Sequence, residues 1–236
     1  MISIANFRIS LKETVKLLKI LNLYKDKGPK DVGDYSSAFL KACRTNKHVH
    51  IYNTIRENLD YEIVLKDDSF FQFCINDNYL RMSFIENPCF SYSKQDYLKL
   101  IFPEIEEEEI TDELINELIN ENEYEQFLNE QEINSNLLYF RYDFDIKGYK
   151  PLLHSCAHIH MNLRESLRIP TSKIVTPLQF VCFCIKQAYN DVWNIYHQNH
   201  LENNVIVEEL KRIKDQNTDI DNGYWQDIEK HELYLI

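Results

Sequence analysis

Glycine, proline and long apolar runs are all scarce in this chain of 236 residues, which holds 4 Gly and 6 Pro. So few glycines and prolines argue against long flexible linkers. No apolar run reaches the roughly 18 residues that a membrane-spanning helix needs. The N-terminus also lacks the charged and apolar regions of a secretory signal. We therefore expect no membrane partner.

Paired cysteine motifs and the common nucleotide-binding motifs are also lacking. The six cysteines include no C-x-x-C pair, and several lie within apolar runs, as Cys74 and Cys182 do. This pattern predicts free, buried thiols in a reducing compartment, and hence a cytoplasmic protein. The chain has no P-loop, no dinucleotide-binding glycine fingerprint and no nucleophile elbow, which excludes the enzymes that depend on these motifs.

Basic residues are missing between Lys99 and Arg141, a stretch that contains 13 Asp and Glu residues. The net charge of −12 arises there, because the rest of the chain has 26 basic and 25 acidic residues. An apolar stripe through residues 104–132 predicts an acidic helical segment packed by one face. Its outer face is either a solvated surface or a docking surface for a basic protein partner. The nearly neutral remainder leaves room for a groove that binds nucleic acid.

Hydrophobic residues make up 44% of the chain and aromatic residues 13%, which is ample for a buried core. We predict a single α+β domain over residues 1–236, with an antiparallel sheet packed against helices on one side. Its parts are a helical region over 1–46, a strand meander over 47–100, the acidic segment 104–132, and a hairpin with a core helix over 136–200. Ser10 and Glu13 predict a capping box that opens a helix over 11–24. Residues 48–52 are predicted to form the first strand of the meander.

Residues 136–146 and 157–163 alternate between apolar and polar side chains, which predicts two paired strands joined by a turn at 147–151. One face of this hairpin is apolar and is expected to pack on the core. The other face collects Tyr139, Arg141, Asp143, His158, His160, Asn162 and Arg164. Thr176 and Pro177 then predict the start of a long core helix that ends near residue 197.

The polar face of the hairpin suits a metal site. His158 and His160 lie two residues apart on one strand, so their rings point the same way. Together with His154 or Asp143 they can bind a divalent metal, for which Zn or Mn is the expected ion. A metal-bound water would then attack a phosphoryl or carbonyl centre.

A metal-free interpretation of the same face stays open. One histidine would act as general base and another as general acid, while Arg141 or Arg164 stabilises the developing negative charge. Tyr139 and Asn162 are further candidate catalytic residues, and Arg164 and Arg168 are candidate substrate-binding residues. The same residues can also form a hydrogen-bonded network that is purely structural.

Two other groupings contain histidine. His48 and His50 repeat the alternation of the hairpin, either as part of the same groove or as an incidental feature of a strand. Cys156 lies at even spacing from His154 and His158, which suits a Cys–His dyad or a buried structural thiol.

Three features of the C-terminal half resemble an uncharacterised bacterial domain-of-unknown-function family. They are the run YFRYDFD at 139–145, the histidines at 154, 158 and 160, and the segment from Arg168-Ile169-Pro170 to Thr176-Pro177. The resemblance implies a bacterial, cytoplasmic protein and brings no function with it.

Three functions remain open on this evidence. The leading hypothesis is a nucleic-acid-directed hydrolase, such as a toxin-like or antiviral-defence nuclease. The alternative is a non-catalytic binding subunit of a bacterial complex, with an acidic docking segment and a hairpin that grips phosphate. A third hypothesis is a small-molecule hydrolase that uses the same metal site.

Overall fold

The protein is an α+β structure built around an antiparallel sheet, as predicted. The computed structural model describes residues 3–45, 47–88, 93–106, 109–134, 137–161, 167–198, 205–232 and 234. Contacts divide the chain into two compact units. The sheet unit comprises Met1–Glu86 and Leu138–Ile236, and the acidic unit comprises Asn87–Leu137. The single-domain organisation stays a prediction.

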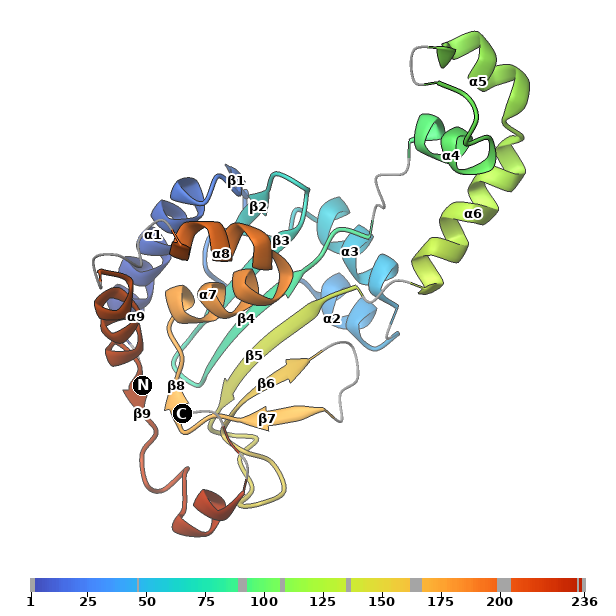
Figure 1. The fold of residues 1–236 in the computed structure, drawn as a ribbon. Coiled ribbons are helices and arrows are strands. Elements are labelled where there is room, and N and C mark those ends of the chain that lie inside the picture. Colours follow the sequence, from blue (N-terminus) through green and yellow to red (C-terminus); the bar gives the residue numbers. More distant parts are fainter. Residues whose placement is uncertain are drawn as a thin grey trace. The chain divides into compact units, whose positions relative to one another are not determined.

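The sheet unit holds a seven-stranded antiparallel sheet in which each strand pairs with its neighbours in sequence. Its strands are β1 (Tyr24–Lys27), β2 (Ile63–Leu65), β3 (Phe70–Ile75), β4 (Tyr79–Ile85), β5 (Tyr139–Asp145), β6 (Ala157–Met161) and β7 (Arg168–Pro170). A separate ribbon pairs β8 (Lys173–Ile174) with β9 (Thr218–Asp219). Figure 1 shows the meander from β1 to β7.

Helices cover both faces of this sheet, so the prediction that they lie on one side is wrong. Successive strand residues alternate between two apolar clusters: Phe71 and Phe73 join one, whereas Phe70 and Cys74 join the other. The larger cluster includes residues of α1 (Ile4–Ile20), α7 (Pro177–Ala188), α8 (Asn190–Gln198) and α9 (Val205–Asp215). The smaller one includes residues of α2 (Ser37–Cys43) and α3 (His48–Glu57). Figure 1 shows α2 and α3 apart from α7 and α8. A short 3-10 helix, η3 (Asp227–His231), lies near the C-terminus.

The N-terminal helix begins earlier than its predicted capping box. Ser3 caps α1 by accepting a hydrogen bond from the backbone N–H of Asn6. Ser10 is buried inside the helix, and its Oγ accepts the backbone N–H of Leu178 at 3.0 Å. Ser10 therefore caps the first turn of α7 rather than its own helix, because that turn leaves N–H groups without an internal partner.

The predicted strand at residues 48–52 is also wrong, because His48–Glu57 is a helix. Its buried residues Ile51, Tyr52 and Ile55 follow helical spacing. The aromatic and β-branched residues of this segment favour a strand, whereas packing against the sheet stabilises a helix.

The C-terminal half follows the prediction more closely. Strands β5 and β6 pair as a hairpin, although their connection runs from Ile146 to Cys156, whereas the turn was predicted at 147–151. Thr176 caps α7, with Pro177 in its first turn, as expected. The predicted single core helix is interrupted at Tyr189, and α8 begins at Asn190.

The acidic unit contains three helices among its described residues: α4 (Lys94–Ile101), α5 (Asp112–Leu118) and α6 (Glu121–Asn134). Four buried residues form its own small core, namely Tyr97, Leu98, Ile115 and Ile119. The predicted helix over residues 104–132 is found only from Asp112 onward, with a break between α5 and α6, whereas the described residues of that range before Asp112 do not form an α-helix. Across the described part of the chain, no helix is long and apolar enough to cross a membrane.

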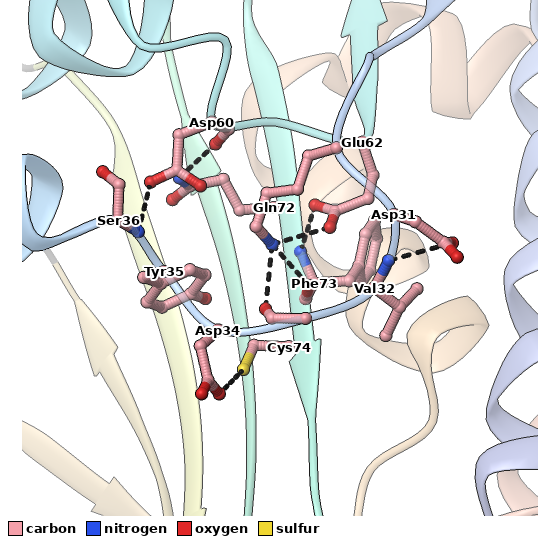
Figure 2. Close-up of polar contacts among 12 residues, drawn as sticks. Asp31, Val32, Asp34, Tyr35, Ser36, Asp60, Glu62, Gln72, Phe73 and Cys74 are labelled. Carbon is pink, nitrogen blue, oxygen red and sulfur yellow. Dashed lines mark hydrogen bonds and ion pairs between the residues drawn. The ribbon is translucent and has the colours of Figure 1, made fainter.

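Side chains complete the hydrogen bonding of β3 beyond the residues that pair with β2. Strand β2 pairs only with Phe70 and Phe71 of β3, so the backbone of Phe73 lacks a strand partner on that side. The carboxylate of Glu62 accepts the Phe73 N–H at 2.7 Å. The ammonium of Lys30 donates to the Phe73 carbonyl at 3.0 Å and to Glu62 at 2.7 Å. Figure 2 shows Glu62 beside Phe73, with the segment from Asp31 to Ser36 running across the sheet.

Candidate metal centre

Three potential metal ligands converge on the hairpin. Asp143 of β5 lies opposite His158 of β6 in the antiparallel register, and His160 lies opposite Arg141. Alternation places all four side chains on the same face of the sheet, as predicted from the sequence. Asp143, His158 and His160 each offer one donor atom within 4.8 Å of the others, and we call these three residues the Asp143 cluster.

The distances inside the cluster are short. The Nε2 atoms of His158 and His160 lie 2.9 Å apart. The Oδ2 atom of Asp143 lies 3.2 Å from His160 Nε2 and 3.9 Å from His158 Nε2. Donor atoms bound to one metal ion at about 2.0–2.2 Å are separated by roughly 3–3.5 Å. The three donors therefore have spacings close to those of a metal-ligand set, and the cluster can hold a metal.

Hydrogen bonding fixes the tautomer of His158. Its Nδ1 lies 3.0 Å from the carbonyl oxygen of Ser155, which only accepts, so Nδ1 carries the proton. Nε2 of the neutral ring then carries a lone pair directed at His160. A histidine whose Nδ1–H donates to a carbonyl while Nε2 faces other donors has the usual arrangement of a metal ligand.

The contacts around His160 Nε2 cannot all be hydrogen bonds. Arg141 Nη2 lies 2.9 Å from this nitrogen and can only donate, whereas His158 Nε2 at 2.9 Å and Asp143 Oδ2 at 3.2 Å can only accept. Nε2 of a neutral ring has either one hydrogen or one lone pair, so it can satisfy only some of these neighbours. A cation among these atoms would satisfy the lone pairs.

Burial sets the charge state of the cluster. The side chains of His158 and His160 are 2% and 4% exposed, and that of Asp143 is 11% exposed. Burial lowers the pKa of His158 to about 4 and also lowers the pKa of His160, so both rings are neutral at pH 7. Burial alone would raise the pKa of Asp143, but its hydrogen bond with His160 and the charge of Arg141 hold it well below its usual range. Two neutral imidazoles and one carboxylate are suitable ligands for a divalent ion.

Two partly exposed arginines contact the carboxylate of the Asp143 cluster. Arg141 donates to Asp143 Oδ2 from Nε at 3.0 Å, and its Nη2 forms an ion pair with the same oxygen at 2.9 Å. Arg81 approaches the other carboxylate oxygen, with Nε 3.8 Å from Oδ1. Within the described residues, neither Arg81 Nε nor Asp143 Oδ1 has a hydrogen-bond partner, although both atoms are buried. The side chains of Arg81 and Arg141 are 31% and 23% exposed, so exposure rises from the imidazoles to the arginines.

Sequence reasoning missed the part of this face that lies on β3 and β4. The strand register aligns a polar row across the sheet, from Gln72 through Ser83 and Arg141 to His160. The hydroxyl of Tyr35 lies 3.1 Å from that of Ser83, and Gln72 Oε1 is buried without a partner. The signal in the sequence was a polar residue within each apolar strand, but the register that aligns these residues was not predictable.

The other predicted site residues have mixed outcomes. His154 packs edge-on against His158, with ring centroids 5.1 Å apart, but it does not join the three convergent donors. Tyr139 is buried on the same face and contributes to the smaller apolar cluster. Arg168 lies opposite His160 in the register of β6 and β7, and its charge contributes to lowering the pKa of His160. Asn162 and Arg164 lie outside the described residues.

The remaining histidine and cysteine groupings carry no site. His48 and His50 lie on α3 rather than on a strand, and the His48 ring bonds to the carbonyl of Glu86. Burial raises the pKa of Cys156 to about 12, so its thiol stays protonated and is a poor nucleophile. None of the five cysteines within the described residues forms a disulfide, as predicted.

Comparison with known proteins supplies a family and no activity. No curated protein and no solved structure matches the chain. Residues 28–221 match the family of uncharacterised conserved proteins DUF2290, so the match extends well beyond the C-terminal half expected from the sequence. The resemblance to a family of unknown function is thereby confirmed, and the chain belongs to DUF2290.

Proposed function

We propose that the protein is a metal-dependent phosphodiester hydrolase that acts on nucleic acid, with its metal held by Asp143, His158 and His160. One observation carries this proposal: two imidazole nitrogens and a carboxylate oxygen converge within 2.9–3.9 Å in a buried site. Three ligand atoms this close together, with the Nε2 lone pair of His158 among them, suit a bound cation.

The donor set suits Zn or Mn, which bind imidazole and carboxylate ligands together. The metal would supply Lewis acidity and lower the pKa of a bound water, which provides a nucleophile at neutral pH. The metal-free alternative fits less well, because burial lowers the pKa of His158 to about 4, far from the neutral value that acid–base catalysis favours.

The arginines give the site its preference for phosphate. Arg81 and Arg141 flank the Asp143 carboxylate and are its most exposed neighbours. Guanidinium groups bind phosphate oxygens through paired hydrogen bonds and stabilise negative charge as it develops. A phosphodiester would therefore approach from the arginine side, with the imidazoles behind it. Arg168, Asn162 and Arg164 remain candidate contacts to the nucleic acid backbone.

Metal content and cleavage test the proposal together. We expect purified protein to bind one equivalent of Zn or Mn per chain, measured by elemental analysis and by titration of metal-stripped protein. Changing both His158 and His160 to Ala should abolish binding and reduce cleavage of single-stranded RNA or DNA at least a hundredfold. A matched control, His50→Ala with His231→Ala, changes two exposed histidines and should leave both readouts intact.

Three results would contradict all or part of the proposal. Wild-type protein that binds neither metal at micromolar concentration removes the metal centre. Metal-stripped protein that cleaves as fast as metal-loaded protein supports acid–base chemistry without metal. A protein that binds metal but cleaves only small phosphoesters would keep the site and remove nucleic acid as the substrate.

A second candidate function is a binding subunit that docks a basic protein through the acidic unit. The observation that favours it is the charge of Asn87–Leu137, which has 14 acidic and 2 basic residues and therefore a net charge of −12. We expect wild-type protein to bind a polylysine peptide in low salt. Neutralising Glu113, Glu117, Glu123 and Glu125 to Gln should weaken this binding about tenfold. A control that neutralises Glu57, Asp77, Glu208 and Glu232 should change binding less than twofold, and equal losses in the two variants would reject docking at the acidic unit.

A further inference from the structure

A groove of about 540 Å³ lies in the sheet unit, far along the sheet from the Asp143 cluster. One wall is the face of α1 that carries residues 8, 11, 12, 15 and 16, which lie together at helical spacing. The opposite wall comes from the end of β1, the segment after it, and the start of β2. The groove is at the β1 edge of the meander, whereas the Asp143 cluster is on β5 and β6.

The rim of the groove is basic. Five cations and two carboxylates line it, which gives the lining a net charge of +3. The carboxylates are already paired: Asp31 with Arg8 at 3.0 Å, and Glu62 with Lys30 at 2.7 Å. Lys12, Lys16 and Lys27 form no ion pair within the part of the chain that the structure describes. Three ammonium groups that form no ion pair there surround one hollow, and their charge attracts an anion; Lys27 also interacts with the Asp31 carboxylate.

The floor of the groove is aliphatic. Leu11, Val15 and Val32 are partly buried, and Ile63 is fully buried beneath them. Among the residues that the structure describes, the lining has no aromatic ring that would stack on a nucleotide base and no amide or hydroxyl side chain that would read its edge. A ligand in the groove would therefore meet aliphatic side chains on the floor and positive charge at the rim.

We propose that this groove binds an aliphatic anion, a molecule with a hydrocarbon body and a carboxylate or phosphate head. The hydrocarbon lies on Leu11, Val15, Val32 and Ile63, and the head is held by the ammonium groups of Lys12, Lys16 and Lys27. The volume is within the range of small-molecule sites, roughly 300–1,000 Å³. The side-chain stems of the lysines extend the apolar contact, since their methylene groups cover hydrocarbon while the charge stays in water.

Binding of two probes to the full-length protein tests the proposal. We expect dodecanoate, below its micellar concentration, to bind with a dissociation constant in the micromolar range by calorimetry. Acetate has the same head and no hydrocarbon body, so it should not bind measurably. Dodecyl phosphate should bind as well as dodecanoate if charge alone selects the head, and preference for one of them identifies the head group.

Charge reversal shows where binding occurs. Lys12→Glu with Lys16→Glu should weaken dodecanoate binding at least tenfold. Lys41→Glu with Lys186→Glu makes the same charge change at two exposed sites outside the groove and should alter binding less than twofold. Circular dichroism of both variants shows whether the fold is kept, and Val15→Ser, which keeps the charge, should also weaken binding.

Three outcomes would overturn the proposal. Absence of dodecanoate binding by the wild-type protein removes it directly. Equal losses in the two double variants place the binding elsewhere. Binding of a 12-nucleotide single strand that depends on Lys12 and Lys16, without dodecanoate binding, makes the groove a contact surface for nucleic acid instead.

Discussion

The sheet unit and the acidic unit carry charge in different ways. The acidic unit has a net charge of −12, which equals the net charge of the whole chain. The sheet unit has 24 basic and 24 acidic residues, and several of its charged groups are buried, such as Glu62 and Asp143. Charge in the acidic unit is therefore mostly a surface property, whereas in the sheet unit it is also built into the interior.

The two units also differ in how their cores are built. Apolar residues from both faces of a seven-stranded sheet stabilise the sheet unit. Four buried apolar residues form the core of the acidic unit, which spans only 51 residues and is small for an independent core. The acidic unit is inserted between β4 and β5, yet these strands pair over their whole length, from Tyr79 with Asp145 to Ile85 with Tyr139. The insertion therefore leaves the register of the sheet intact.

Core substitutions in each unit give the largest expected effects. Phe84 is fully buried on β4 and stacks near Phe71 and Phe140. Phe84→Ala should lower the free energy of unfolding of the sheet unit by about 3–5 kcal/mol. Leu98→Ala should cost about 2–5 kcal/mol in the smaller core and unfold the acidic unit locally. Hydrogen exchange resolved along the chain measures both changes.

The pattern of exchange decides whether the units unfold separately. Leu98→Ala should raise exchange across α4, α5 and α6 and leave β3, β4 and β5 protected. Phe84→Ala should raise exchange across the sheet. If Leu98→Ala also removes protection from the sheet strands, the two units unfold together and the comparison between them fails.

The fold was predictable where local signals and packing agreed. Strand β3 is rich in aromatic residues and is bounded by turn residues, and it lies within the predicted meander. The strand prediction at 48–52 was wrong because the aromatic and β-branched residues there favour a strand. Burial of Ile51, Tyr52 and Ile55 on one side requires a helix instead. Such contacts between distant segments leave little trace in local sequence.

The candidate site was predictable in its residues and not in its surroundings. Alternation along β5 and β6 places Asp143, His158 and His160 on one face, since a period of two follows from strand geometry. Arg81 and Ser83 reach the same face only through the register of β4 with β5. That register is set by pairing across the inserted acidic unit, which no local pattern in the sequence reveals.

The buried carboxylate of Glu62 tests the contrast between the buried acidic residues of the sheet unit and the exposed ones of the acidic unit. Its expected effect is smaller than that of the core substitutions. Burial raises its pKa to about 7, against the pull of Lys30, whereas the ordinary value is 4.5. Between pH 4.5 and 7 the folded protein holds a proton that the unfolded chain has lost. Raising the pH through this window should therefore lower the free energy of unfolding, by about 1–3 kcal/mol at 1.4 kcal/mol per unit.

Glu62→Gln isolates this contribution, because Gln keeps an oxygen that accepts the Phe73 N–H and cannot ionise. Gln resembles the protonated carboxyl group, so wild type and variant should have similar stability near pH 4.5. The wild type should then lose stability relative to the variant as the pH rises from 4.5 to 7, measured by denaturant unfolding. Glu117→Gln, at an exposed site of the acidic unit, should leave the slope unchanged. Parallel curves for wild type and Glu62→Gln would mean that Glu62 is ionised throughout, and that the buried and exposed acids of the two units respond to pH alike.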